Sequence, residues 1–234
     1  MHALAVDLHA LDAMPTARPK TAAKEAPIRD PGEWTQTAQH HGTSLEAVRH
    51  AAERCRGCEL WERATQTVFG EGPRRARLML VGEQPGDAED RAGEPFVGPA
   101  GKLLDRALER AGIERADVYV TNAVKHFSWE ERGKWRIHKK PRPSNVTACR
   151  PWLLIEIALV QPEVIVGMGA TAARSLAGPA ARVLRDRGKP IPSALAPALY
   201  LTVHPSSLLR APDEKAREEG FAAFVADLRR AART

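Results

Sequence analysis

Four short apolar segments alternate with helical patterns along this chain, and this alternation constrains the fold more than any other feature. The expected strands span residues 77–81, 117–124, 163–166 and 199–203, and the expected helices span residues 100–111, 144–160, 171–177 and 213–232. Strands that alternate with helices predict a mostly parallel sheet that is covered on both faces. The segments are short and mostly apolar, as buried parallel strands are. We therefore expect an α/β protein, a three-layer α/β/α sandwich with a mostly parallel four-stranded central sheet.

A boundary near residue 42 divides the chain into two parts. Residues 1–42 contain four prolines and show no sustained periodicity, which predicts a flexible Pro/Ala-rich N-terminal tail. Residues 43–234 are enough for one folded domain, which we expect to begin with a capping box at residues 43–46 and a short helix that extends to Arg54. No apolar run reaches about 18 residues and no secretory signal pattern is visible, so we expect a cytoplasmic protein.

One segment carries the whole net charge of the chain. Residues 125–150 contain eight Lys or Arg and two acidic residues, whereas the rest of the chain contains 27 basic and 27 acidic residues. A local basic cluster of this kind indicates contact with phosphate groups. We expect a cationic, proline-interrupted loop at residues 134–141, between a strand and a helix, which places His138 among cations. An ordinary solvated loop is the alternative interpretation.

Each expected strand is followed by residues whose chemistry suits a ligand site. The first is followed by Gly-Glu-Gln-Pro-Gly-Asp at 82–87, the second by Asn122 and the basic loop, the third by Gly-Met-Gly at 167–169, and the fourth by His-Pro-Ser-Ser at 204–207. In open α/β sheets, ligands bind at the carboxyl ends of the strands. We therefore expect these four loops to form one pocket.

Three cysteines and one histidine form a candidate metal site. Cys55 and Cys58 make a Cys-x-x-Cys pair, Cys149 lies far downstream, and His126 is the best-placed fourth ligand. Zinc and iron–sulfur clusters both take soft thiolate ligands, so the residues alone leave the two equally open. A redox role would place the pair at the start of a helix after a strand, whereas here it follows a helix. Alternatively, Cys149 is simply a small buried apolar residue.

Five motifs of this chain, taken in order, resemble those of the family 4 uracil-DNA glycosylases. They are Cys-x-x-Cys at 55–58, Gly-Glu-Gln-Pro-Gly-Asp at 82–87, Pro-Phe-Val-Gly-Pro-Ala-Gly at 95–101, Thr-Asn-Ala-Val-Lys at 121–125 and His-Pro-Ser at 204–206. The resemblance covers roughly residues 50–230. Gln84, which replaces the usual Ala, and an inserted Arg-Ile-His-Lys segment at 136–139 look like the UdgX branch. Members of that branch excise uracil and then stay covalently joined to the abasic site.

The resemblance implies an activity, a cofactor and a partner. The activity is uracil-DNA glycosylase, followed by a covalent bond between His138 and the abasic site. The cofactor is a [4Fe–4S] cluster on Cys55, Cys58, His126 and Cys149, with His126 where the wider family often has Cys. The partner is uracil-containing DNA, single-stranded by expectation and double-stranded as an alternative. We expect no membrane contact, no other small-molecule cofactor and a monomer.

The resemblance also implies a uracil-binding site. Phe96 would stack on the flipped base, Asn122 would read its Watson–Crick edge, and His204 would stabilise the leaving uracil anion. An Asn side chain can donate to O4 and accept from N3–H, a pattern that cytosine cannot satisfy. The loops of Gly82 and Gly86 would complete this site.

The remaining implied roles concern the nucleophile and the DNA. His138 would attack C1′ and Glu83 would orient it and accept its proton, while Gln84 and Asp87 would position the nucleophile or a water. The implied DNA-binding residues are Lys134, Arg136, Lys139, Lys140, Ser206, Ser207 and Arg210, with Leu208 or Leu209 as a minor-groove wedge. Two alternatives remain open: a turnover glycosylase in which His138 merely assists a water, and a non-catalytic iron–sulfur DNA-binding sensor.

Overall fold

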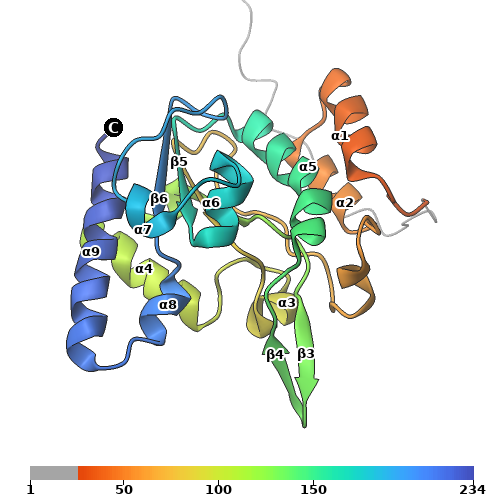
Figure 1. Cartoon of the computed structure of the whole chain (residues 1–234). Coiled ribbons are helices and arrows are strands. Elements are labelled where there is room, and N and C mark those ends of the chain that lie inside the picture. Colours follow the sequence, from red (N-terminus) through yellow and green to blue (C-terminus); the bar gives the residue numbers. More distant parts are fainter. Residues whose placement is uncertain (1–25) are drawn as a thin grey trace, which may run out of the picture.

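A parallel sheet of four strands, in the order β2-β1-β5-β6, lies at the centre of the computed structural model, which describes residues 26–234 (Figure 1). The strands are β1 (Leu78–Gly82), β2 (Val118–Asn122), β5 (Val164–Met168) and β6 (Ala198–Thr202). All their residues are buried, and Leu80 of β1 pairs in register with Val120 of β2 and Val166 of β5. The predicted α/β sandwich with a four-stranded parallel sheet is confirmed.

Helices cover both faces of the sheet because successive strand residues point to opposite sides. Leu78 and Leu80 pack with α4 (Pro99–Ala111), α8 (Pro205–Leu209) and α9 (Glu214–Ala232). Met79 and Val81 pack with α5 (Pro143–Val160) and α6 (Ala170–Ala177). The other helices are short: α1 (Pro31–His40), α2 (Leu45–Ala52), α3 (Asp87–Ala92), α7 (Val183–Asp186), and the 3₁₀ turns η1 (Glu59–Glu62) and η2 (Arg115–Asp117). Within the described residues, no helix combines the length and the apolar character that crossing a membrane requires.

The N-terminal segment differs from the expected tail. Residues 31–40 form α1, which Asp30 caps by accepting the backbone N–H of Gly32 at 2.8 Å. The ring of Trp34 lies 5.1 Å from that of Trp152 in α5, so α1 packs against the domain rather than standing apart from it. The prediction of a tail is therefore wrong for residues 26–42, while residues 1–25 lie outside the described part. The physical reason is that packing of the partly buried Trp34 against the buried Trp152 can anchor a helix whose own sequence is only weakly amphipathic.

The start of α2 also differs by one residue from the expected capping box. Ser44, not Thr43, caps the helix by accepting the backbone N–H of Ala47 at 3.2 Å. The hydroxyl of Thr43 donates instead to the carbonyl of Ala38 at the end of α1. The Thr43 hydroxyl, which the local pattern assigned to the cap, is thus used in a contact between the two helices.

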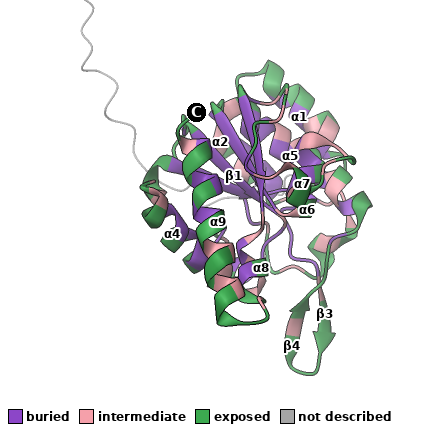
Figure 2. Cartoon of the chain, turned by 60° about the vertical axis from the view of Figure 1, so that its left-hand side comes forward, coloured by how far each residue is buried: buried purple, intermediate pink, exposed green. Residues whose placement is uncertain are grey.

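The basic segment forms a β-hairpin, whereas the sequence predicted an irregular loop. Strands β3 (Trp129–Arg132) and β4 (Trp135–His138) pair antiparallel and project from the body of the domain (Figure 1). Gly133 and Lys134 form the two-residue turn, and Gly133 has φ +60°, as the first position of a primed hairpin turn requires. Nearly all of the hairpin is exposed (Figure 2). The Gly-Lys pair between two β-prone runs was the signal that could have predicted it.

Candidate functional site

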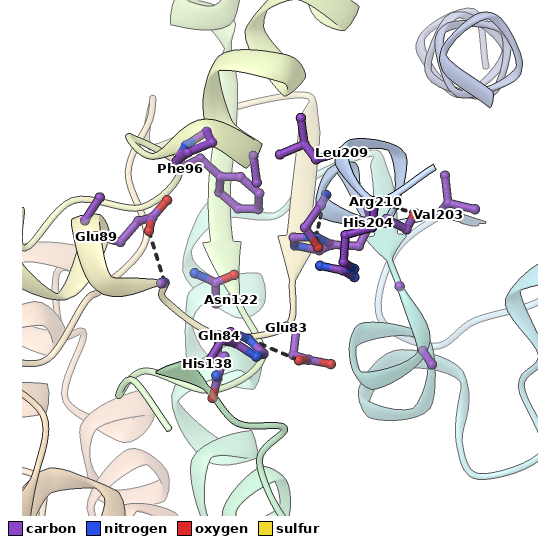
Figure 3. A pocket seen from close by; sticks show the side chains of 18 of the residues that line it. Glu83, Gln84, Glu89, Phe96, Asn122, His138, Val203, His204, Leu209 and Arg210 are labelled. Atoms are coloured by element: carbon purple, nitrogen blue, oxygen red, sulfur yellow. Dashed lines mark hydrogen bonds and ion pairs between the residues drawn. The ribbon is translucent and has the colours of Figure 1, made fainter. Parts of the chain in front are cut away.

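A cleft of about 910 Å³ opens at the carboxyl ends of the strands. The residues that line it come from all four of the predicted loops, from the loop before α4 and from the end of β4 (Figure 3): Glu83, Gln84, Gly86, Asp87, Phe96, Asn122, His138, Gly169, His204, Ser206, Ser207, Leu209 and Arg210, among others. The prediction that these loops form one pocket is confirmed. Parallel strands place their carboxyl ends at one edge of the sheet, and the chain must return from that edge through each loop.

Asn122, the last residue of β2, lies at the bottom of the cleft. Its side chain is 3% exposed and its Oδ1 atom is buried without a hydrogen-bond partner in the described part of the chain. Its backbone carbonyl accepts a hydrogen bond from Lys125 Nζ at 2.8 Å, which holds the residue in place. A buried acceptor without a donor costs free energy, so this oxygen is suited to a ligand that brings an N–H group.

The ring of Phe96 lies against Asn122 and above the end of β1. A Cβ atom at Gly82 would lie 2.6 Å from Phe96 Cζ and 2.4 Å from Asn122 Oδ1, so only glycine leaves room for both side chains. Phe96 itself has φ +60°, an uncommon backbone conformation for a residue other than glycine. Glu89 holds this loop: its carboxylate accepts the N–H of Gly98 at 2.9 Å and that of Gly86 at 3.0 Å. Sequence reasoning did not single out Glu89.

His204 caps the start of α8 and faces Phe96 across the cleft, with the ring centroids 6.0 Å apart. Its Nδ1 accepts the backbone N–H of Ser206 at 3.2 Å, so a neutral ring carries its proton on Nε2. Burial, as the main cause, and the nearby His138 and Arg210 together lower the pKa of His204 to about 4. At neutral pH this residue is therefore an uncharged N–H donor in the cleft.

The depressed pKa of His204 predicts a loss of stability in acid. In the unfolded chain His204 binds a proton below about pH 6.5, whereas in the folded chain it binds one only below about pH 4. The contribution of the neutral His204 to the free energy of unfolding should therefore be complete above pH 6.5 and should decrease as the pH is lowered. Between pH 7 and pH 5 the loss from this residue should be about 2 kcal/mol. Urea unfolding of the wild-type chain and of His204→Gln at both pH values measures it; an equal pH dependence in the two proteins would contradict it.

His138, the last residue of β4, reaches the cleft from the hairpin. Its Nε2 lies 3.6 Å from the Glu83 carboxylate, and its ring is tilted against Phe127 at 6.2 Å. The second carboxylate oxygen of Glu83 accepts a hydrogen bond from the Thr171 hydroxyl of α6. The histidine is half-exposed and the carboxylate is mostly covered, so the structure brings the predicted pair together at the mouth of the cleft.

Gln84 has contacts that bear on which of its two expected roles, the positioning of the nucleophile or of a water, is open to it. Its amide N–H groups donate to the carbonyls of Ser128 and Lys139, both at 3.1 Å, and its oxygen accepts the N–H of Ser128 at 3.1 Å. These contacts use both of its donor hydrogens on the two ends of the hairpin. Gln84 therefore joins the loop after β1 to the hairpin rather than presenting a free amide to a water.

Arg136, an expected phosphate contact, pairs with the carboxylates of Asp87 and Asp90. The Arg136 guanidinium donates to Asp87 and, at 2.6 Å, to the buried carboxylate of Asp90, and its side chain is only 15% exposed. Burial alone would raise the pKa of Asp87, but the hydrogen bonds and charges of Arg91 and Arg136 together outweigh it and lower the pKa below its ordinary value. Arg136 thus ties the hairpin to α3, and its guanidinium is engaged by two carboxylates.

The other expected DNA-binding residues lie in two places, at the cleft and on or beside the hairpin. Ser206, Ser207 and Arg210 line it, and the hydroxyl of Ser207 donates to the carbonyl of His204 at 2.7 Å. Lys134, Lys139 and Lys140 lie exposed on or beside the hairpin, and Lys139 pairs with Glu130 at 3.2 Å. Of the two candidate wedge residues, Leu208 is buried in the core, whereas Leu209 is 44% exposed and lines the cleft.

The part of the chain that builds this cleft is similar to proteins of known function. A sequence profile of the Uracil DNA glycosylase superfamily matches residues 69–229. The chain belongs to the uracil-DNA glycosylase superfamily. The Type-4 uracil-DNA glycosylase of Thermotoga maritima is 39% identical over 167 residues, which are 71% of this chain and 83% of that protein. The Type-4 uracil-DNA glycosylase of Pyrobaculum aerophilum is 37% identical over 175 residues, 72% of this chain and 86% of that protein.

The three cysteines of this uracil-DNA glycosylase superfamily member lie after α2 and within α5, and none of them lines the cleft. Cys55 and Cys149 belong to one buried cluster with Trp152, whose indole N–H donates to Cys55 Sγ at 3.2 Å. The backbone N–H of Lys125 donates to Cys149 Sγ at 3.3 Å, while burial raises the pKa of Cys149 to about 12. Within residues 26–234, however, no three His, Cys, Asp or Glu side chains are placed closely enough to hold a metal ion.

A buried ion pair lies between these cysteines and the cleft, and sequence reasoning missed it. Lys125 pairs with Glu156 of α5, and both side chains are almost fully buried. Glu156 also accepts hydrogen bonds from the hydroxyls of Tyr119 and Thr121, each at 3.0 Å. Because Lys125 Nζ donates to the carbonyl of Asn122, the pair supports the bottom of the cleft. A fully paired buried charge of this kind contributes to the placement of neighbouring residues more than to stability.

Proposed function

We propose that this chain is a uracil-DNA glycosylase that excises uracil from DNA. The observation that carries the proposal is the buried, unpaired Oδ1 of Asn122 at the bottom of a cleft that Phe96 and His204 flank. Uracil has an N3–H donor for this acceptor, whereas cytosine has a bare N3 and would leave the oxygen unpaired. The Type-4 uracil-DNA glycosylases of T. maritima and P. aerophilum lend support through their similarity.

The reaction needs the base outside the helical stack and a stabilised leaving group. The target nucleotide would flip into the cleft, where the ring of Phe96 can stack on the base. When the bond between C1′ and uracil N1 breaks, its electron pair leaves with uracil and negative charge develops on O2. The neutral Nε2–H of His204 is suited to donate to that oxygen, since a donor aimed at developing charge lowers the barrier.

We propose further that the chain belongs to the UdgX branch, in which His138 captures the sugar. After the C1′–N1 bond breaks, a lone pair of the neutral His138 ring would form a new bond to C1′. The ring would then hold an extra proton, which can pass to the Glu83 carboxylate 3.6 Å from Nε2. The uracil anion takes up a proton from water. The product is a protein covalently bound to the abasic site, so each molecule would act once.

The structure suggests how the hairpin would serve this step. Gln84 holds both ends of the hairpin, and Arg136 ties its middle to Asp87 and Asp90. A nucleophile is effective only when it is held within reach of its target. We therefore assign Gln84, Asp87 and Arg136 to the positioning of His138. Lys134, Lys139, Lys140, Ser206, Ser207 and Arg210 remain the proposed contacts to the DNA backbone.

One experiment separates the proposed function from its alternatives. The full chain is incubated with a labelled, uracil-containing single-stranded oligonucleotide, and the products are analysed for free uracil and on a denaturing gel. We expect stoichiometric release of uracil and a band of protein-bound DNA that survives denaturation. Repeated turnover without that band would indicate the conventional glycosylase, and binding without uracil release would indicate the non-catalytic sensor. A matched oligonucleotide with thymine in place of uracil is the control.

We also propose a [4Fe–4S] cluster on Cys55, Cys58, Cys149 and His126. The N–H···S hydrogen bonds to Cys55 and Cys149 are of the kind that thiolate ligands of clusters accept. The Thr67 hydroxyl donates to the carbonyl of Ala52, so it accepts from His126 Nε2 at 2.9 Å and leaves Nδ1 as the ligating nitrogen. The chemistry of the donor set therefore fits a cluster, and its ligands would have to draw together around it.

The cluster predicts a brown protein after purification without oxygen. Iron and sulfide should each be present at about four per chain, with broad absorption in the visible range. Cys149→Ser should lower both contents and the absorption together, because a hydroxyl is a poor ligand for iron in such clusters. A colourless chain that contains zinc and no sulfide would contradict the cluster and favour a zinc site.

A further inference from the structure

The β3–β4 hairpin has one face against the domain and one face toward solvent. Residues opposite each other in an antiparallel pair share a face. The register therefore places Trp129, Glu131, Arg136 and His138 on one face, and Glu130, Arg132, Trp135 and Ile137 on the other. The first face is anchored, since Arg136 pairs with Asp90 and the indole N–H of Trp129 donates to the carbonyl of Arg63 at 2.9 Å. We call the second set the outer face.

The outer face presents a large aromatic ring to solvent. Trp135 is 74% exposed and Ile137 is 40% exposed. Within residues 26–234, no ring contact and no side-chain hydrogen bond joins Trp135 to another residue. The hairpin projects from the domain and is mostly exposed (Figure 2). Single exposed apolar residues are common on surfaces, but a tryptophan ring that is 74% exposed leaves an unusually large flat surface in water.

The strand that carries Trp135 is held to the domain near the cleft. Trp135 and His138 are the two ends of β4, so they lie roughly 10 Å apart along the strand at the usual rise per residue. Gln84 and Arg136 hold this strand to the domain, as described above. A nucleotide whose sugar reaches His138 would therefore have neighbours of the same strand within reach of Trp135.

The charge around the ring is that of a phosphate-binding surface. Arg132 lies opposite Trp135 in the hairpin, Lys134 precedes it in the turn, and Lys140 follows β4. In the described part of the chain, none of these three forms an ion pair with a carboxylate. Proteins that bind single strands combine such cations, which follow the backbone, with aromatic side chains on which bases stack.

We propose that Trp135 stacks on an unpaired base near the excised uracil, so that the chain prefers single-stranded DNA to duplex. The inference rests on the proposed function for the identity of the nucleic acid. Each base of a duplex already stacks on two neighbours, whereas a base of a single strand has a free face for the indole. Every base has such a face, so the contact should be tolerant of sequence.

The test measures binding of the full chain to labelled oligonucleotides that contain no uracil, so that no reaction intervenes. Trp135→Ala should weaken binding to single-stranded DNA about tenfold, within the range of one base–aromatic stacking contact. Binding to the duplex of the same sequence should change less than about twofold. Trp135→Phe should restore most of the affinity. Trp61→Ala, at another exposed tryptophan, is the matched control and should bind as the wild type does.

Two further readouts separate stacking from charge and locate the contact. Trp135→Ala should leave the salt dependence of binding unchanged, whereas Lys140→Ala should lower the log–log slope by about 0.7. A 2-aminopurine placed in turn at each position near an abasic analogue should be quenched by the wild type at one position and not by Trp135→Ala.

Equal affinities of wild type and Trp135→Ala for single strands would overturn the inference, as would an equal loss on single-stranded and duplex DNA. Uracil release by the wild type, measured in parallel, reports on the proposed function alone. The stacking contact and the glycosylase activity can therefore fail independently.

Discussion

Replacing His138 with serine is expected to abolish the denaturant-resistant adduct and to keep part of the uracil release. The adduct needs a ring nitrogen at C1′, and serine offers none. In the proposed mechanism, base recognition and leaving-group stabilisation depend on Asn122 and His204, which lie outside the hairpin. The smaller side chain leaves space for a water, which can capture the sugar cation in place of the ring. The wild type, which in the proposed mechanism acts once, should differ from His138→Ser, which should release uracil in repeated turnovers.

The measurement is a denaturing gel together with a count of uracil released per protein molecule. His50→Ser is the matched control, because His50 is exposed, pairs with Glu53 and lies outside the cleft. Glu83→Gln should slow adduct formation, since an amide cannot take the imidazole proton. An adduct that persists in His138→Ser would place the nucleophile elsewhere. If neither adduct nor free uracil formed, His138 would be needed before the C1′–N1 bond breaks.

Asn122→Asp is expected to lower the rate of uracil excision by about 10³-fold at neutral pH. The variant puts a carboxylate where the amide stands, and an ionised carboxylate cannot donate to uracil O4. Its negative charge also lies beside the uracil anion that forms as the C1′–N1 bond breaks. Loss of one well-placed polar group in such a site typically costs 10²- to 10³-fold, and the repulsion adds to it.

Single-turnover excision from saturating uracil-containing DNA measures this effect. Affinity for an oligonucleotide without uracil serves as the control, because Asn122 lies at the bottom of the cleft and should not contact DNA whose bases stay stacked. Circular dichroism of the variant checks that the loss does not come from unfolding. A rate equal to that of the wild type would mean that another residue reads the base.

Much of the fold and of the cleft was predictable because it depends on short-range patterns. The four strands were found within one or two residues of their observed bounds, since their apolar runs and flanking helices are local features. Parallel topology then required the loops after them to meet at one edge. Asn122 and His204, which end or follow those strands, could therefore be assigned to one pocket before any distance was known.

The errors lie where a distant residue overrides a local pattern. The Trp34 ring packs against Trp152 in α5, so α1 is part of the domain although its own sequence suggested a tail. Gln84 and Asp87 were expected to position the nucleophile or a water, and the motif alone could not show that their hydrogen bonds go to the hairpin that carries His138. Arg136 was expected to contact phosphate because of its charge, but in the structure it forms an ion pair with Asp90.

By itself, the sequence determined the layered sheet, the edge at which a ligand binds and the kinds of side chain that meet there. Only the tertiary structure decided which of those side chains remain free for a ligand. Free and engaged groups have the same sequence signature, because a hydrogen bond between Gln84 and Ser128 spans 44 positions and leaves no periodic trace. The Asn122 side chain has an unpaired oxygen, whereas the Gln84 side chain is hydrogen-bonded. This difference depends on which distant backbone groups the fold brings within about 3 Å of each side chain.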